Sequence, residues 1–153
     1  MKYIYLITII TLAALTSACD SGPSVASASG NIDDYSLGTD TNCSSSHSKV
    51  GNTGTLTTFA HSVSGTVTII DDCTIEITGF NYDGGGPQVY FYAGTNGNYT
   101  DANAFRFSQL LTGTSFNNKT IRLIIPNPKS LDSFNSLSVW CVDFNANFGD
   151  IIF

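Results

Sequence analysis

Residues 66–78 read Thr-Val-Thr-Ile-Ile-Asp-Asp-Cys-Thr-Ile-Glu-Ile-Thr. Apolar and polar residues alternate on both sides of the Asp-Asp pair, and a period of two is the pattern of a strand with one buried face. Two such runs joined by a short polar turn predict a β-hairpin whose outer face contacts water. This hairpin indicates an all-β fold.

Further short runs follow toward the C-terminus. Residues 80–87 contain three consecutive glycines and a proline, which predicts a tight loop. Strands are expected at 88–93 and 121–125, whereas 105–111 fits either a helical turn or a strand. Short strands separated by turn clusters are typical of a sandwich or barrel. We therefore predict a small antiparallel β-sandwich over residues 55–153.

The last predicted strands, 137–144 and 148–153, end the chain. By alternation, residues 137–144 form two apolar sets, with Leu137, Val139 and Cys141 on one face and Trp140, Val142 and Phe144 on the other. A strand that is apolar on both faces belongs in the interior of a sandwich or under a covering loop. Cys141 is therefore expected to be shielded from solvent.

Residues 1–18 have the pattern of an export signal, with Lys2, an apolar stretch and small residues before Cys19. This arrangement resembles the lipobox of bacterial lipoproteins, although Thr16 stands where Leu is usual. The resemblance implies that Cys19 carries a lipid and anchors the protein to a membrane of a bacterial cell envelope, at the periplasmic or outer surface. The alternative is an ordinary secretory peptide that leaves Cys19 unmodified.

Residues 19–54 are rich in Ser, Gly and Asn, and their few apolar residues show no period, which predicts a disordered, flexible tether. Removal of residues 1–18 would leave five basic and twelve acidic residues, a net charge of −7. This charge argues against nucleic acid as a partner, because such binding needs a basic face.

Export would place Cys43, Cys73 and Cys141 in an oxidising compartment, where disulfides form. The number is odd, so one cysteine is left over when two pair. Two pairings are open. A bond between Cys73 and Cys141 would cross the sandwich, and a bond between Cys43 and Cys73 would leave Cys141 free.

Several stretches together resemble the DM-thirteen domain family, the electron-transfer domain of Skeletor-type proteins, which also occurs in bacterial lipoproteins. The loop that carries Tyr82, Asp83, Gly84, Gly86 and Pro87, followed by the strand that carries Trp140 and Cys141, is the most specific part. The resemblance covers residues 56–153. This chain departs from the family pattern at Gln88, where an acidic residue is common, and by the presence of Cys73.

The resemblance implies a non-enzymatic electron-transfer or redox accessory beside a membrane redox protein. The family cysteine maps onto Cys141, which would act as a free thiol or hold a prosthetic group such as haem. Trp140 would pack near it, and His61 is the imidazole that matches the family. Hydrolase chemistry is not indicated, because Glu76 is the sole glutamate and no Gly-x-Ser-x-Gly elbow occurs.

A second class of function is a non-catalytic ligand-binding or structural envelope domain whose cysteines are disulfide staples. Aromatic platforms for a flat ligand would come from Tyr82, Tyr90, Phe91, Tyr92 and Tyr99. No metal site is expected, because the run that begins at Asp83 fits neither a calcium loop nor a phosphate-binding loop.

Overall fold

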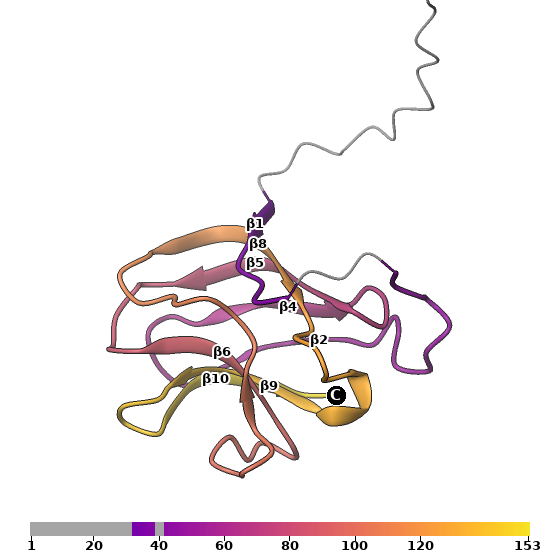
Figure 1. The fold of residues 1–153 in the computed structure, drawn as a ribbon. Helices are drawn as coiled ribbons and strands as arrows, with labels where there is room; N and C mark the ends of the chain where they lie inside the picture. The colour runs from indigo at the N-terminus through magenta and orange to yellow at the C-terminus, as the bar shows by residue number, and fades with distance from the viewer. Residues whose placement is uncertain (1–31, 39–41) are drawn as a thin grey trace, which may run out of the picture.

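Two five-stranded sheets build the protein in the computed structural model, which describes residues 32–38 and 42–153 (Figure 1). The first sheet has the order β1 (Ile32–Asp34), β8 (Phe116–Ile124), β5 (Thr74–Tyr82), β4 (Ser64–Ile69) and β2 (Thr53–Thr55). The second has the order β3 (Thr57–Thr58), β10 (Ala146–Ile152), β9 (Ser136–Cys141), β6 (Val89–Gly94) and β7 (Phe105–Arg106). All strand pairs are antiparallel except β1 with β8, and one 3-10 turn, η1, spans Leu131–Ser133. The expected all-β sandwich is confirmed.

The predicted hairpin is formed by β4 and β5. Ile69 lies opposite Ile75, and Val67 opposite Ile77, and these four side chains are buried because they face the second sheet. On the outer face of β5, the Glu76 carboxylate accepts a hydrogen bond from Arg122 of β8 at 2.9 Å. Alternation alone therefore placed the strands and the turn at 71–73 correctly.

Strand β9 lies in the middle of the second sheet, and all six of its residues are buried. Leu137, Val139 and Cys141 belong to the core between the sheets. On the outer face, Trp140 packs against Tyr99 with ring centroids 5.4 Å apart, so the segment after β6 covers this face. The expectation of a strand buried on both faces is confirmed.

The end of this strand was predicted too far along the chain. β9 stops at Cys141, and Val142 to Asn145 form the turn to β10, where the Asn145 N–H is bonded to the Val142 carbonyl at 3.3 Å. Asn145 has a φ of 47°, a left-handed conformation that asparagine tolerates in turns. Val142 and Phe144 are consequently exposed, which corrects their expected place on an inner face.

Part of the predicted tether is structured. β1 pairs with β8, where Ile32 lies opposite Thr120. The ring of Tyr35 meets that of Phe116 edge to face at 5.2 Å. Composition did not reveal these contacts, because edge pairing depends on the partner strand. Residues 19–31 and 39–41 of the predicted tether lie outside the described part of the chain.

The export signal at residues 1–18 and the lipidation site at Cys19 also lie outside the described residues. Within residues 32–38 and 42–153, no helix has the length and apolar character needed to cross a bilayer.

Candidate functional site

Cys141 is the last residue of β9 and is held between two neighbouring strands, opposite Val89 of β6 and Ala146 of β10. Its side chain is completely buried, and the thiol donates a hydrogen bond to the carbonyl of Pro87 at 2.9 Å. In the part of the chain that the structure describes, Cys141 is the one cysteine outside a disulfide. The structure thus places a thiol at the edge of the core, beneath a loop.

The loop over this thiol spans residues 83–88 and carries the predicted glycine-rich motif. The predicted loop at 80–87 began too early, because residues 80–82 continue β5 in its pairing with β8. The Tyr82 hydroxyl donates to the carbonyl of Gly85, which ties the loop to the core. Gly86 has a φ of 85°, and a Cβ built there would lie 3.0 Å from the ring of Phe148. Only glycine allows the backbone to lie so close to that ring in this conformation.

His61 holds the outer side of the same loop. Its Nδ1 lies 3.0 Å from Oδ1 of Asp83, and its carbonyl accepts from the Asp83 N–H at 3.2 Å. The imidazole also rests on Phe148 with ring centroids 4.2 Å apart. His61 is therefore a residue that positions the loop, and its Nδ1 is engaged by a carboxylate. The sequence predicted Phe148 as the first residue of a strand and did not predict its contacts with His61 and Gly86.

Two side chains beside the loop have shifted acidities. The N–H of Gly85 donates to the Asp83 carboxylate at 2.7 Å and, with His61 as a smaller cause, lowers the pKa of Asp83. Burial raises the pKa of Tyr82, and the nearby Asp83 and Cys141 act in the same direction. Tyr82 therefore stays a neutral hydrogen-bond donor, whereas Asp83 stays a carboxylate.

The variant Asp83→Asn should reveal this carboxylate as a pH-dependent contribution to stability. A lowered folded-state pKa stabilises the fold above the unfolded pKa of about 3.9, and the stabilisation is lost as the pH falls through the folded value. Asp83 is half exposed, so the expected loss at pH 7 is ~0.5 kcal/mol, or about 2–4 °C in Tm. In thermal unfolding, the difference should shrink toward zero as the pH falls through the folded-state pKa of Asp83. Equal Tm values at pH 7 would contradict the expectation, and Asp101→Asn in another turn is the control.

Trp140 lies on the other face of β9 from the thiol. Its partners across the sheet are Tyr90 and Asn147, and its ring contact is with Tyr99. The residues that surround the thiol come instead from the loop at 83–88 and from Tyr82. Trp140 thus packs on the outer face of the sheet, opposite the thiol. His61 binds the loop at Asp83, and Cys141 binds it at Pro87.

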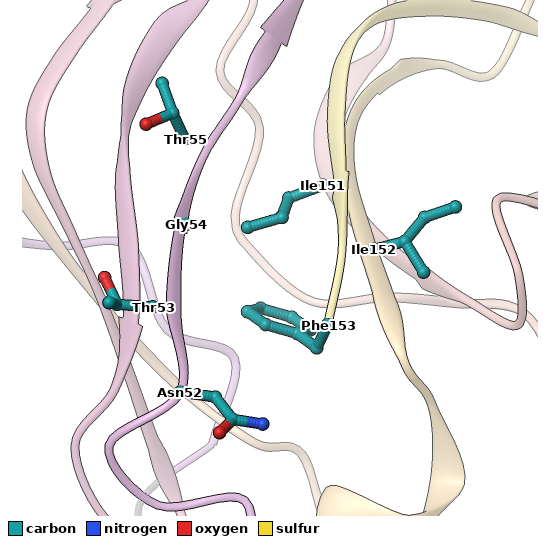
Figure 2. A pocket seen from close by; sticks show the side chains of 7 residues that line it. All are labelled: Asn52, Thr53, Gly54, Thr55, Ile151, Ile152 and Phe153. Carbon is teal, nitrogen blue, oxygen red and sulfur yellow. The ribbon is translucent and has the colours of Figure 1, made fainter.

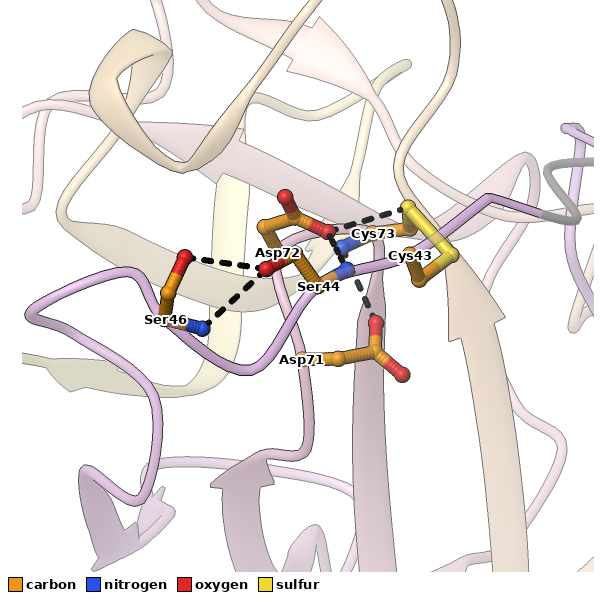
Figure 3. The surroundings of a disulfide bond; sticks show 6 residues. All are labelled: Cys43, Ser44, Ser46, Asp71, Asp72 and Cys73. Atoms are coloured by element: carbon orange, nitrogen blue, oxygen red, sulfur yellow. Dashed lines mark hydrogen bonds between the residues drawn. A yellow bond between two sulfur atoms is a disulfide. The ribbon is translucent and has the colours of Figure 1, made fainter.

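The other two described cysteines, Cys43 and Cys73, form a disulfide with a Cα–Cα distance of 5.5 Å (Figure 3). The Asp72 carboxylate accepts the Ser44 N–H at 2.6 Å, and the Asp71 carboxylate accepts the Cys73 N–H at 3.0 Å. The four side chains Cys43, Asp71, Asp72 and Cys73 lie together, but the disulfide uses both sulfurs. The Asp71 carboxylate caps the turn, and the Asp72 carboxylate holds the segment at Ser44. The pairing that leaves Cys141 free is the one observed.

The alternative bond between Cys73 and Cys141 is ruled out by the length of β5. Cys73 precedes the first residue of this strand, whereas Tyr82 at its last residue lies beside Cys141. Nine residues at about 3.3 Å each separate the two ends by roughly 30 Å, far beyond the reach of a disulfide. The disulfide and the thiol therefore cannot exchange with each other in the folded domain.

The arrangement does not fit haem. The sulfur of Cys141 is buried and donates to a backbone carbonyl, so it offers no ligand atom to a macrocycle. The two histidines are also engaged elsewhere, His61 by Asp83 and His47 by Asp132 of η1 at 3.4 Å.

A groove of about 360 Å³ lies between β2 and the end of β10, away from Cys141 (Figure 2). Its lining consists of Asn52, Thr53, Gly54, Thr55, Ile151, Ile152 and Phe153. These residues include no titratable side chain.

The proposed aromatic platforms are not assembled on one surface. Tyr82, Phe91 and Tyr99 are buried. Tyr90 and Tyr92 are half-buried neighbours on one face of β6, and Arg106 lies over Tyr90 at 5.0 Å from the ring centroid. The aromatic residues therefore serve mainly as packing groups.

Comparison with known proteins agrees with this geometry. Protein Skeletor, isoforms B/C, of Drosophila melanogaster is 40% identical over 103 residues, which cover 64% of this chain and 13% of that protein. Isoforms D/E of the same protein are also 40% identical over 103 residues, which cover 7% of their length. This chain thus matches only a small part of those relatives, and no solved structure matches it. The sequence profile of the family described as Electron transfer DM13 matches residues 55–153, and the chain therefore belongs to that family.

Proposed function

We propose that this protein is a non-enzymatic electron-transfer accessory of the bacterial cell envelope, in which Cys141 exchanges electrons with a membrane redox protein. One observation carries the proposal. Cys141 remains a thiol beneath the glycine-rich loop, whereas the other two described cysteines are joined in a disulfide. Membership of an electron-transfer family supports a redox-related role. The disulfide-staple interpretation applies to Cys43 and Cys73, and among the described residues no further cysteine remains to pair with Cys141.

The membrane would be reached through a lipid on Cys19 after removal of residues 1–18. Support for this comes from the export pattern and from the small residues before Cys19. A single acyl chain binds a membrane only weakly, so stable attachment requires the multiple acyl chains that a lipoprotein carries. Mass spectrometry of the mature N-terminus tests it, and a free, unmodified Cys19 would remove the anchor from the proposal.

The chemistry open to a single thiol is exchange with a disulfide of the partner. The deprotonated sulfur of Cys141 attacks one partner sulfur, a new S–S bond forms, and the partner's own S–S bond breaks. The second partner sulfur leaves as a thiolate and takes up a proton. Cys141 is thereby oxidised into a mixed disulfide, and the leaving partner sulfur is reduced. Because the Cys141 sulfur is buried, the loop at 83–88 must move before this step.

The oxidation state of Cys141 decides the proposal. Differential alkylation and mass spectrometry should be applied to protein from its native envelope, prepared without reductant. We expect Cys141 as a free thiol or as an adduct with another molecule. Quantitative bonding of Cys141 to another cysteine of the same chain, resistant to mild reductant, would refute the electron-transfer role.

Gly85→Ala should open the loop over Cys141. A Cβ at this position would lie 2.6 Å from Nδ1 of His61 and 3.0 Å from the Asp83 carboxylate, so the loop and the imidazole must separate. We expect iodoacetamide to modify Cys141 about tenfold faster, which corresponds to a shift of ~1.4 kcal/mol toward the open loop.

The matched control for this prediction is Gly51→Ala. Gly51 has a φ of 87°, and a Cβ at this position would meet no atom within 4 Å, so alanine strains the backbone far from the loop. An unchanged rate in Gly85→Ala, or an equal increase in both variants, would contradict a gating role for the loop.

A further inference from the structure

The turn between β9 and β10 carries two exposed apolar side chains. Phe144 is 71% exposed, the highest value among the large hydrophobic side chains of the described residues, and Val142 is 36% exposed. Turns usually carry small or polar residues. The fold does not account for a phenylalanine at this position.

This turn follows Cys141 directly and is hydrogen-bonded to the loop that covers the thiol. The Val142 N–H donates to the carbonyl of Gln88 at 3.1 Å, and the Gln88 amide donates to Asp143 at 2.8 Å. Pro87, whose carbonyl accepts from Cys141, is itself exposed. We name this surface the thiol cap, and it consists of Pro87, Gln88, Val142, Asp143 and Phe144. In Figure 1 the β5–β6 connection and the β9–β10 turn lie at the same end of the sandwich.

The charged side chains of these two segments have one sign. The connection at 83–88 and the turn at 142–145 contain Asp83 and Asp143 and neither Lys nor Arg. The five cationic side chains of the described residues contact groups outside both segments: Lys49 with Leu131, Arg106 with Tyr90, Lys119 with Asp33, Arg122 with Glu76 and Lys129 with Phe105. The imidazole of His61 is the titratable group that faces Asp83.

We infer that the thiol cap is the docking face for the redox partner, and that it fits a protein surface with an exposed disulfide, an apolar centre and a basic rim. The inference rests on the electron-transfer role proposed above, since that role selects the occupant. Phe144 and Val142 would bury apolar area against the partner, while Asp83 and Asp143 would attract and orient its basic side chains. Docking here would bring a partner disulfide to the loop that shields Cys141.

The charges favour this occupant over two others. A second copy of the chain related by a two-fold axis through this face would place Asp143 near Asp143, and each copy carries a net charge of −7 after removal of residues 1–18. An anionic membrane surface would be repelled for the same reason. A basic partner is attracted, and its affinity should fall as salt screens the charges.

The test uses the full-length mature chain, labelled with ¹⁵N, and a disulfide-cyclised probe peptide with the sequence Lys-Lys-Cys-Leu-Trp-Cys-Lys-Lys. A second peptide with Glu in place of every Lys is the charge control. We expect amide chemical-shift changes that cluster at Gln88 and at residues 142–144, because Pro87 has no N–H. Affinity should weaken at least threefold in Phe144→Ser and in Asp143→Asn, and it should fall with added salt.

Ile70→Ser and Asp101→Asn are matched controls outside the thiol cap, and both should leave affinity unchanged. Equal binding of the Glu peptide, shifts that cluster elsewhere, or perturbation of the cap only through self-association would overturn the inference. If the Lys peptide does not bind although Cys141 is alkylated as a free thiol, the docking face is refuted and the electron-transfer role is not. If Cys141 is instead bonded to another cysteine of the same chain, the electron-transfer role itself is refuted.

Discussion

Phe80→Ala is expected to lower the free energy of unfolding by about 3–5 kcal/mol, the usual range for removal of a buried phenylalanine ring. Phe80 is completely buried in β5, and its ring lies 5.1 Å from that of Phe91 and 5.2 Å from that of Phe116. Phe91 belongs to the other sheet, so the ring of Phe80 joins the two layers. The resulting cavity would lie under the contacts that hold Tyr82 and the glycine-rich loop.

Equilibrium unfolding in urea measures this effect. The midpoint should shift to lower urea while the slope stays the same, because the surface exposed on unfolding hardly changes. Phe59→Ala is the control, since this side chain is 59% exposed and its loss should cost less than ~0.5 kcal/mol. A loss below ~1.5 kcal/mol in Phe80→Ala would show that the two sheets do not depend on this contact.

The strands of the sandwich could be predicted from the sequence where one face of the strand contacts solvent. In the β4–β5 hairpin the alternation of Val67, Ile69, Ile75 and Ile77 specifies both register and buried face. The same rule failed at the end of β9, because Val142 and Phe144 continue the apolar pattern although the chain turns there. Val142 and Phe144 are apolar but lie outside the core. An apolar pattern by itself cannot distinguish such exposed residues from buried ones.

The candidate site could be predicted only in part. The sequence indicated Cys141, the loop at 83–88 and His61 as members of one family pattern, and the structure brings all three to one end of the sandwich. It did not indicate that the Pro87 carbonyl is the acceptor for the thiol, because a backbone acceptor leaves no trace in residue identity. The choice between disulfides also stayed open, since it depends on which end of β5 each cysteine occupies.

Removal of the disulfide in Cys43→Ala/Cys73→Ala is expected to lower the free energy of unfolding by about 3.5 kcal/mol. The bond closes a loop of 30 residues, and the loop-entropy relation gives a value of that size. Unfolding in urea measures the loss, with the singly substituted Cys141→Ala as the control that keeps the disulfide. A loss below ~1 kcal/mol would mean that contacts such as those of Lys49 with Leu131 and Phe134 already hold the segment in place.

The same double variant tests whether the two sulfur sites are independent. The disulfide lies before β5 and the thiol lies beyond its other end, so loss of the staple should loosen the segment at 42–54 without moving the loop over Cys141. Alkylation of Cys141 in the absence of denaturant should therefore proceed within about twofold of the native rate, as local opening is set by nearby contacts. A rate that rises tenfold in this variant, with the protein still folded, would mean that the staple controls access to the thiol and that Cys43 and Cys73 belong to the redox mechanism.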